Sequence, residues 1–171
     1  MKLKLVPNDA KILREKCVKV KAVDDEVRKA LDGMVDFCKS NILPRVLALA
    51  ANQGGINQRL IVIFDHKEIL RLANPKIIEQ KGTQRFFEAC VNVGKPNDFV
   101  GGFVDRPAQI KLEALDYYGE KVKIKASGIL AVMLCHEIDH LDGILYTDKL
   151  VGDLHHFKTP EERLAFRKNL K

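Results

Sequence analysis

The chain of 171 residues has no tryptophan, and only 6% of its residues are aromatic. Nucleic-acid-binding modules often stack bases on aromatic side chains beside clustered basic residues. Here the basic residues are spread along the chain, so we expect no DNA-binding module. The formal net charge of +6 still allows weak attraction to nucleic acid or to a ribosome.

Long apolar runs are also absent. The segment from Met1 to Ala10 contains polar residues throughout and lacks the run of roughly 7–15 apolar residues that a signal peptide needs. No later stretch approaches the ~18 apolar residues of a membrane span. We therefore expect a soluble, intracellular protein that has no membrane partner.

The four cysteines show no paired spacing. An intracellular chain of this length usually keeps its thiols reduced, and with 46% hydrophobic residues it can bury a core without disulfides. We expect a single domain over residues 1–171 and interpret each cysteine by its own surroundings.

Hydrophobic periodicity predicts the first elements. Apolar residues recur every three or four positions from Asp24 to Ser40, which predicts an amphipathic helix with Cys38 on its buried face. The short β-branched segments Arg59–Asp65 and Leu70–Ile78 predict strands. Alternation resumes on both sides of a turn in residues 110–124, which predicts a hairpin.

Two further helices are predicted towards the C-terminus. One runs from Ser127 to Leu141 and ends at Gly143, since glycine readily takes the left-handed conformation. The other begins at Thr159 as N-cap, with Glu162 completing a capping box, and continues as a basic segment to Lys171. Strands arranged around a central helix indicate an α+β fold.

The central helix contains the sequence His136-Glu-Ile-Asp-His140. Residues four apart lie about 40° around a helix and about 6 Å along it, so both imidazoles can bind one ion. Glu137 can reach a water molecule on that ion as general base, and an ion lowers the pKa of such water to about 7. A chance histidine pair is the alternative, but the adjacent glutamate in a chain with only 5 histidines favours a metal site.

A catalytic metal site needs a third protein ligand and one open position. Metzincin spacing places a third histidine where this chain has Tyr146, so that class is excluded. Glu161 and Glu162 are already explained by the start of a helix. Downstream residues therefore offer no convincing ligand.

The cysteines are the remaining candidates. Cys135 lies about 140° from the face of His140, and Cys17 lies in a lysine and valine alternation that indicates an edge or surface segment. Cys90 lies between a strand region and a glycine-rich loop, Gly94–Gly102, from which a thiolate could face a site. We predict Cys90 as the third ligand.

A cysteine combined with this histidine motif resembles the peptide deformylase family. The motif at His136–His140 matches fully, Glu88–Asn92 (EACVN) resembles the family pattern E-G-C-[L/I]-S, and Val46–Gln53 (VLALAANQ) resembles G-x-G-L-A-A-x-Q. The order and spacing of motifs also agree from Val6 to about Leu150. The resemblance implies a central metal-binding helix packed against antiparallel β-sheets, with a C-terminal helix.

The resemblance also implies an activity and a cofactor. Such an enzyme removes the N-formyl group from N-formylmethionyl nascent chains and releases formate. Cys90, His136 and His140 would bind one divalent metal ion, Fe(II) in the family, with Zn, Ni or Co also suited to these ligands. Glu137 would act as acid and base, in a bacterial cytoplasm or in the matrix or stroma of an organelle.

Other roles follow from the same resemblance. Gln53 and the backbone N–H of Val91 would polarise the formyl oxygen. Glu88 would pair with Arg106, as a partly buried carboxylate requires. The predicted substrate contacts are Leu47, Ala48, Leu49 and Val91, together with Ile129, Val132 and Met133, which could line an apolar slot for the methionine side chain or belong to the core.

The first two motifs depart from the family pattern. Val46, Ala48 and Ala89 stand where the family has glycine, and Asn92 stands where it has serine. Glycine is used where φ is positive or where a backbone must approach a ligand closely. Two alternatives therefore remain open: a metal hydrolase for another N-acyl or peptide substrate, and a catalytically weak, ribosome-associated binding protein.

Overall fold

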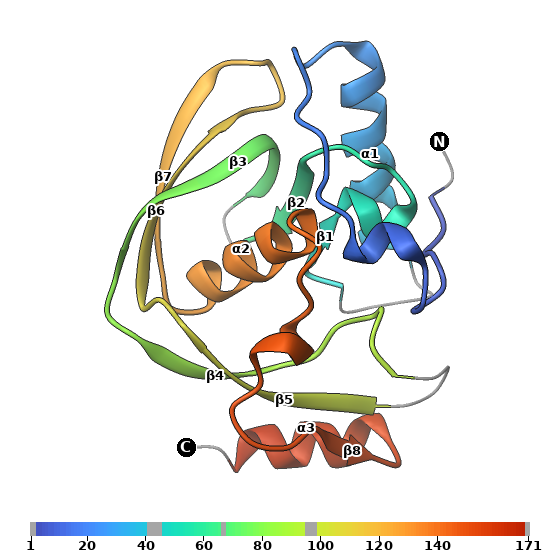
Figure 1. Ribbon diagram of the computed structural model, residues 1–171, viewed down its shortest axis with the longest axis vertical. Coiled ribbons are helices and arrows are strands. Elements are labelled where there is room, and N and C mark those ends of the chain that lie inside the picture. The colour runs from blue at the N-terminus through green and yellow to red at the C-terminus, as the bar shows by residue number, and fades with distance from the viewer. Residues whose placement is uncertain (1–2, 41–45, 66–67, 95–98, 170–171) are drawn as a thin grey trace.

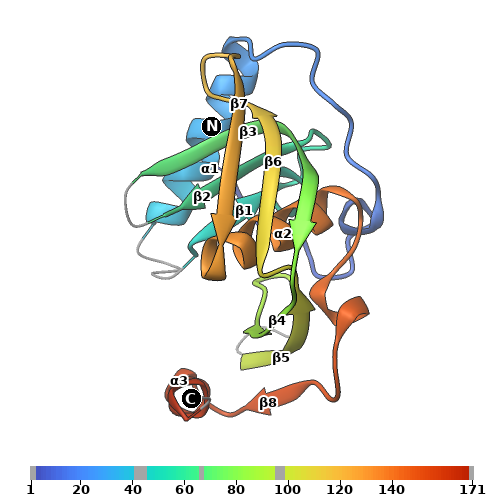
Figure 2. The ribbon, with the colours of Figure 1, turned by 90° about the vertical axis from the view of Figure 1, so that its left-hand side faces the viewer.

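A computed structural model describes residues 3–40, 46–65, 68–94 and 99–169 of the chain (Figures 1 and 2). Its named strands pair in antiparallel fashion in two sheets, one in the order β1-β2-β3-β6-β7 and one in the order β4-β5-β8. The strands are β1 (Ala48–Ala50), β2 (Leu60–Phe64), β3 (Ile69–Lys81), β4 (Gln84–Glu88), β5 (Phe99–Arg106), β6 (Gln109–Leu115), β7 (Lys121–Ser127) and β8 (His155–Phe157). The helices are α1 (Asp25–Lys39), α2 (Gly128–Leu141) and α3 (Pro160–Lys168), with short 3-10 helices η1 (Lys11–Arg14), η2 (Ala51–Gly54) and η3 (Tyr146–Lys149). The predicted α+β class is confirmed.

Strand β2 is buried on both faces, which explains its continuous apolar run. Alternate side chains point to opposite sides of a sheet. Ile61 and Ile63 face an inner cluster against α2, while Leu60 and Val62 face an outer cluster against α1. The inner cluster includes Leu72, Leu112, Leu134, Ile138 and Leu141; the outer cluster includes Leu31, Met34, Val35, Cys38 and Leu49.

Helix α1 confirms the predicted helix and its buried cysteine. Asp24 is the N-cap, and its side chain accepts a hydrogen bond from the Val27 N–H at 2.9 Å. The Cys38 thiol is 7% exposed within the outer cluster, and burial raises its pKa to about 12. The thiol is therefore an inert part of the core.

Helix α2 lies at the centre of the molecule, between the five-stranded sheet and the N-terminal part of the chain (Figure 1). It contacts β1, β2, β5, β6, β7 and η2. Two buried side chains bind the carbonyls of its last residues: Asn52 Nδ2 donates to His140 O at 2.6 Å, and Arg59 Nη1 donates to Leu141 O at 3.2 Å. Gly143 follows with φ of 74°, as predicted for the residue after the helix.

The smaller sheet is joined to α3 by aromatic rings. The ring of Phe166 on α3 packs against Phe87 at 5.1 Å and against Phe157 at 5.3 Å between centroids. At the start of α3, Thr159 Oγ1 accepts a bond from Glu162 N at 3.2 Å, as predicted. The Glu162 carboxylate accepts from Lys158 N, one residue before the expected partner. Residues 170–171 of the predicted basic segment lie outside the described residues.

Cys17 lies in an edge or surface segment, as predicted, with Lys16, Val18 and Lys19 exposed, but its own side chain points into the core. Its side chain is 4% exposed within the inner cluster, whereas the neighbouring Val18 is 61% exposed. The backbone determines this orientation, because Cys17 N donates to Leu141 O at 2.8 Å and Arg59 N donates to Val18 O at 2.8 Å. These tertiary hydrogen bonds turn the cysteine inward, which the local alternation of residues does not reveal.

The predicted glycine-rich loop is shorter than expected. Gly101 and Gly102 belong to strand β5, and residues 95–98 lie outside the described residues. Both glycines are needed for close packing. A Cβ atom at Gly101 would lie 2.5 Å from the Phe87 ring, and one at Gly102 would lie 2.3 Å from the Leu150 side chain.

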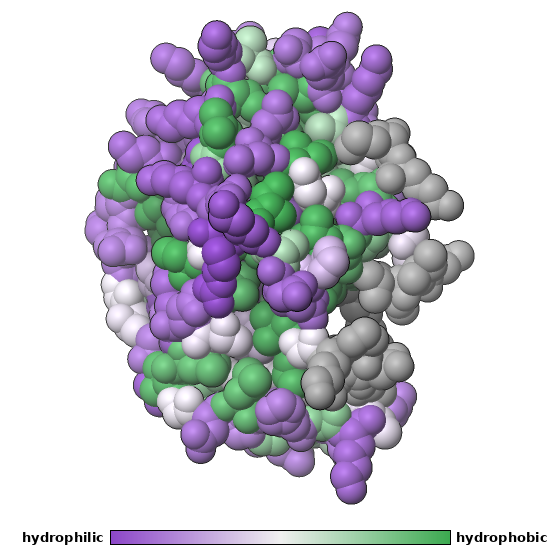
Figure 3. Space-filling view, turned by 45° about the vertical axis from the view of Figure 1, so that its right-hand side comes forward, coloured by the Kyte–Doolittle hydropathy of each residue, from purple (hydrophilic) through white to green (hydrophobic). Residues whose placement is uncertain are grey.

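The surface of the described residues is mixed in character. On the face drawn in Figure 3, apolar side chains come to the surface in patches among hydrophilic ones. Among the helices in the described ranges, none has both the length and the apolar character to cross a bilayer.

The turn after α2 generates a stability prediction. Gly143 and Gly152 have φ of 74° and 85°, but a Cβ atom at Gly143 would lie 2.6 Å from Arg14 O, while at Gly152 nothing lies within 4 Å. Left-handed backbone costs alanine about 1–2 kcal/mol at either site, and overpacking adds roughly 1–3 kcal/mol at Gly143 alone. In urea unfolding, Gly143→Ala should therefore lose clearly more stability than its control, Gly152→Ala. Equal losses would show that the contact with Arg14 is not constraining.

Candidate metal centre

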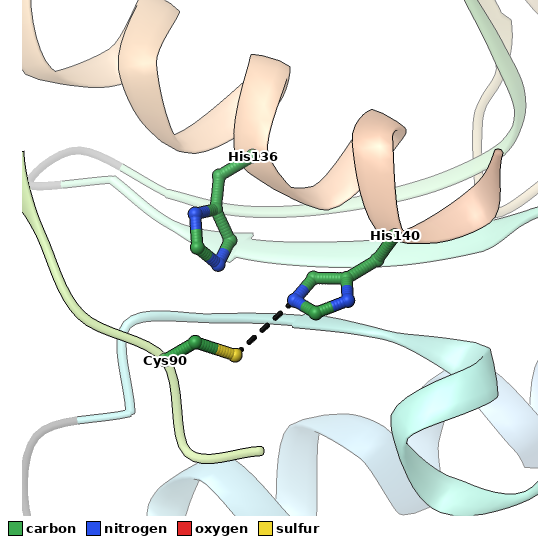
Figure 4. A group of neighbouring side chains, drawn as sticks. All are labelled: Cys90, His136 and His140. Atoms are coloured by element: carbon green, nitrogen blue, oxygen red, sulfur yellow. Dashed lines mark hydrogen bonds between the residues drawn. The ribbon is translucent and has the colours of Figure 1, made fainter. Parts of the chain in front are cut away.

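Three side chains that can bind a metal meet beside α2 (Figure 4). His136 and His140 extend from successive turns of the helix, and Cys90 lies just after β4. One ligand atom from each residue lies within 4.8 Å of the others, and Cys90 Sγ is 3.2 Å from His140 Nε2. The structure thus brings together the three ligands predicted from sequence.

A buried carboxylate orients the first histidine. His136 Nδ1 lies 2.7 Å from Glu88 Oε2, which leaves Nε2 for the ligand position. Arg106 holds the same carboxylate with two bonds, of 2.7 Å and 2.9 Å. Burial alone would raise the pKa of Glu88, but the hydrogen bonds from Arg106 and His136 outweigh it and hold the pKa at about 2. Glu88 is therefore an anion that fixes the ring of His136.

The hydrogen-bond network of Glu88 and Arg106 continues to Asp139, a residue that was not predicted from the sequence. Arg106 Nη1 also bonds to the Asp139 carboxylate, and Lys149 Nζ lies 2.7 Å from both oxygens of that group. Asp139 lies on α2 between the two histidines, three residues after His136. A residue three positions after His136 lies about one helical turn from it, and this spacing was the sequence signal that could have identified Asp139. Arg106 thereby joins β5 to the metal-binding helix.

The second histidine is suited to bind as a neutral ring. His140 is 1% exposed, and burial, followed by the charge of His136, lowers its pKa well below the usual value. Its Nδ1 is buried and finds no hydrogen-bond partner among the described residues. A neutral imidazole whose Nε2 faces a thiol fits a divalent ion. One thiol and two imidazoles also leave the fourth position of a tetrahedral site open for a reactant.

Glu137 lies beside the cluster but is not part of it. Its side chain is 4% exposed, and within the described part of the chain Oε2 finds no hydrogen-bond partner. Burial raises its pKa to about 7, against the opposing charge of His136. A carboxyl group with that pKa can both accept and donate a proton near neutral pH.

Gln53 directs its amide group towards the cluster. The side chain is 2% exposed, and Oε1 accepts from Ala50 N at 2.8 Å. Nε2 lies 3.1 Å from Asn92 Oδ1 and 3.5 Å from Cys90 Sγ. The donor end of the amide is thus the end that faces the cluster.

The predicted substrate contacts differ in exposure. Leu47 is 52% exposed, Ile129 44% and Val91 37%, whereas Val132 is 3% exposed. Ala48 and Met133 are half-buried. Leu49 is fully buried in the outer cluster, so only its backbone could contact a peptide.

The substituted glycine positions are compatible with the backbone. Asn74, with φ of 54°, is the one residue other than glycine with positive φ in the described ranges. Val46, Ala48 and Ala89 are described and lie outside that conformation. Side chains at these positions therefore cause no strain of φ.

The fold and the Cys90, His136 and His140 cluster together are those of a metal-dependent hydrolase. Residues 2–154 match the family described as Polypeptide deformylase. The chain is 43% identical over 141 residues to "Peptide deformylase 2" of Clostridium acetobutylicum, covering 82% of this chain and 90% of that protein. It is 39% identical over 158 residues to "Peptide deformylase" of Acetivibrio thermocellus, covering 92% and 89%. The chain belongs to the peptide deformylase family.

Solved structures agree with this assignment. The crystal structure of a peptide deformylase from Synechococcus elongatus in complex with actinonin has a TM-score of 0.79 and 30% sequence identity, covering 97% of this chain and 85% of that one. The predicted fold, with its central helix, antiparallel sheets and C-terminal helix, is therefore confirmed.

The Glu88–Arg106 pair generates a prediction with an internal control. The side chains of Glu88 and Arg106 are 4% and 2% exposed. The control is the ion pair of Arg85 and Asp105 on the same two strands, whose side chains are 56% and 40% exposed. Arg106→Ala should lower the free energy of unfolding by about 3–5 kcal/mol, because it leaves a buried carboxylate without its main partner. It should also weaken metal binding by roughly 10–100-fold, through His136.

Arg85→Ala should leave both quantities almost unchanged, because water screens an exposed pair. Urea unfolding and competition with a chelator measure the two effects. Similar losses from the two variants would contradict the assigned role of Arg106.

Proposed function

We propose that this enzyme uses one divalent metal ion, bound by Cys90, His136 and His140, to remove the N-formyl group from N-formylmethionyl nascent chains. The observation that carries the proposal is the convergence of these three side chains, with the adjacent Glu137 buried and its Oε2 without a hydrogen-bond partner among the described residues. The relatives named above as peptide deformylases support the same reaction.

The ion is proposed to be Fe(II), and Zn, Ni or Co would also suit one thiolate and two imidazoles. When bound, such an ion polarises a carbonyl oxygen and lowers the pKa of water. Cys90 would bind as its thiolate, and His136 would bind through Nε2 because Glu88 holds Nδ1.

Glu137 is proposed to carry the proton through the reaction. Its carboxylate takes a proton from water as the oxygen attacks the formyl carbon. It then gives that proton to the amide nitrogen as the C–N bond breaks, which yields the amine and formic acid. The remaining proton of the attacking water leaves the formic acid for the amine or for solvent, so that formate is released. A pKa raised by burial to about 7 suits both steps.

Two donors are proposed to stabilise the negative charge on the formyl oxygen. One is Gln53 Nε2, which faces the cluster, and the other is the backbone N–H of Val91, directly after Cys90. Removing one such donor from an oxyanion site typically costs about 10²–10³ in rate.

The peptide is proposed to bind along β1. This strand is at the edge of its sheet, and its inner side is paired with β2 through Phe64 N and Leu47 O. Backbone groups alternate along an antiparallel strand, so those of Ala48 point outward, where an extended peptide can pair with them. Ile129, Val132 and Met133 would then receive the methionine side chain.

We further propose that the protein acts in the cytoplasm on nascent chains. The net charge of +6 supports a weak attraction to the ribosome. The two alternatives, another N-acyl substrate and a binding protein without turnover, are not favoured by the named relatives.

The metal-loaded protein should release formate from a short formyl-methionyl peptide. Glu137→Ala should lower kcat by about 10²–10⁴, because it removes the proton carrier. Its metal content should stay near that of the unsubstituted protein, since Glu137 is not a ligand. A coupled formate dehydrogenase assay measures the product. No formate from metal-loaded, unsubstituted protein would refute the proposed activity.

The ligand set is tested by metal content. Protein purified without oxygen should contain about one iron per chain, and Cys90→Ala should lose most of it because a thiolate ligand is removed. Cys135→Ala is the matched control, because that thiol is 5% exposed in the inner cluster. Elemental analysis of the three proteins gives the ratios. Retention of full metal content by Cys90→Ala would exclude the cysteine as a ligand.

A further inference from the structure

Three residues form a closed ring of hydrogen bonds beside the candidate metal centre. Val6 N donates to Gln53 O at 2.9 Å, Gln53 Nε2 donates to Asn92 Oδ1 at 3.1 Å, and Asn92 Nδ2 donates to Val6 O at 3.0 Å. The ring joins the N-terminal segment, η2 and the turn after Cys90. It was not expected from the sequence, where Asn92 stood out only as a departure from the family serine.

The ring determines which way the Gln53 amide points. A primary amide has a donor end and an acceptor end of nearly equal size, so it can be turned by 180° at little steric cost. Here Oε1 accepts from Ala50 N, and Asn92 presents an acceptor to Nε2. The reversed amide would put two oxygens together at Asn92 and two donors together at Ala50. Asn92 thus keeps the donor end towards the metal centre.

The arrangement leaves one N–H of Gln53 for a reactant. Nε2 carries two hydrogens, and Asn92 accepts one of them. The same nitrogen also donates to Cys90 Sγ at 3.5 Å, and because sulfur is a weak acceptor, an oxygen atom of a reactant could take over this second N–H. The second N–H is therefore held in the direction where the proposed mechanism needs a donor.

The Asn92 side chain is itself held in place by the N-terminal segment. Asn92 is 1% exposed, and its donor end is used by Val6 O. The segment is itself fixed by packing, because the Leu3 side chain lies so close to Gly54 that a Cβ there would be 2.5 Å away. Asn8 Nδ2 donates to Gly94 O, a bond that belongs neither to the ring nor to this packing. A serine at position 92 would offer a single oxygen atom, where asparagine offers an acceptor and a donor on different atoms.

We infer that Asn92 is a positioning residue that acts through Gln53, holding its amide donor towards the formyl oxygen while anchored by the N-terminal segment. The inference rests on the proposed deformylase activity. It gives the substitution of serine by asparagine in the second motif a defined role.

A double-mutant cycle tests this inference. Asn92→Ala should lower kcat by about tenfold, the effect of one misdirected hydrogen bond, with KM and metal content changed less than about twofold. In the Gln53→Ala background the same substitution should cause no further loss of kcat. Asn92→Ser should recover part of the loss, because its hydroxyl can accept from Gln53. Asn8→Ala, which removes a nearby bond outside the ring, should keep the original kcat.

A second measurement does not depend on activity. In zinc-loaded protein labelled with ¹⁵N, the side-chain NH₂ signals of Gln53, assigned by their absence in Gln53→Ala, should shift in Asn92→Ala and not in Asn8→Ala. Equal losses of kcat from Asn92→Ala in both backgrounds, or unshifted Gln53 signals, would overturn the inference. If the unsubstituted protein releases no formate, the NMR result still decides whether Asn92 orients Gln53.

Discussion

The buried pair between Glu88 and Arg106 connects the parts of the protein on which the candidate site depends. Glu88 ends β4 opposite Gly102, and Arg106 ends β5 opposite Gln84, so the pair links the two ends of the β4–β5 ladder just before the chain reaches Cys90. The same carboxylate holds His136, and the same guanidinium reaches Asp139 on α2. A buried charge is tolerated only when its partners are in place, so these elements depend on one another.

The candidate metal centre is thus assembled from two sides. Helix α2 supplies two imidazoles and Glu137, while β4 supplies the thiol through the turn that follows it. A third element, η2, brings Asn52 to the end of α2 and Gln53 to Asn92. Asn52 and Gln53, neighbours on η2, therefore bind α2 and the turn after Cys90 respectively. Through them, η2 links the two sides from which the site is built.

Local patterns were sufficient for the three α-helices, for β2, β3 and the β6–β7 hairpin, and for part of the site, but they did not predict β1, β4, β5 or β8. The bounds of α1 follow from apolar periodicity and the Asp24 cap, the end of α2 follows from Gly143, and β2 follows from an apolar run. The spacing of His136 and His140 is a property of any helix, so the pair of imidazoles was predictable without a structure. Cys90 was chosen by eliminating other ligands and was then supported by the family pattern around it.

Tertiary contacts decided what local patterns could not. Cys17 is buried because backbone bonds to Leu141 of α2 and, at the next residue, to Arg59 turn it inward. Gly101 and Gly102 lie in a strand because they pair with β8 and β4. The ring through Asn92 joins residues far apart in the chain, and hydrogen bonds of that kind leave no periodic signal. The residues alone specify helices, strands and the types of ligand, because these depend on near neighbours. Which way a buried amide or thiol points depends on groups that only folding brings together.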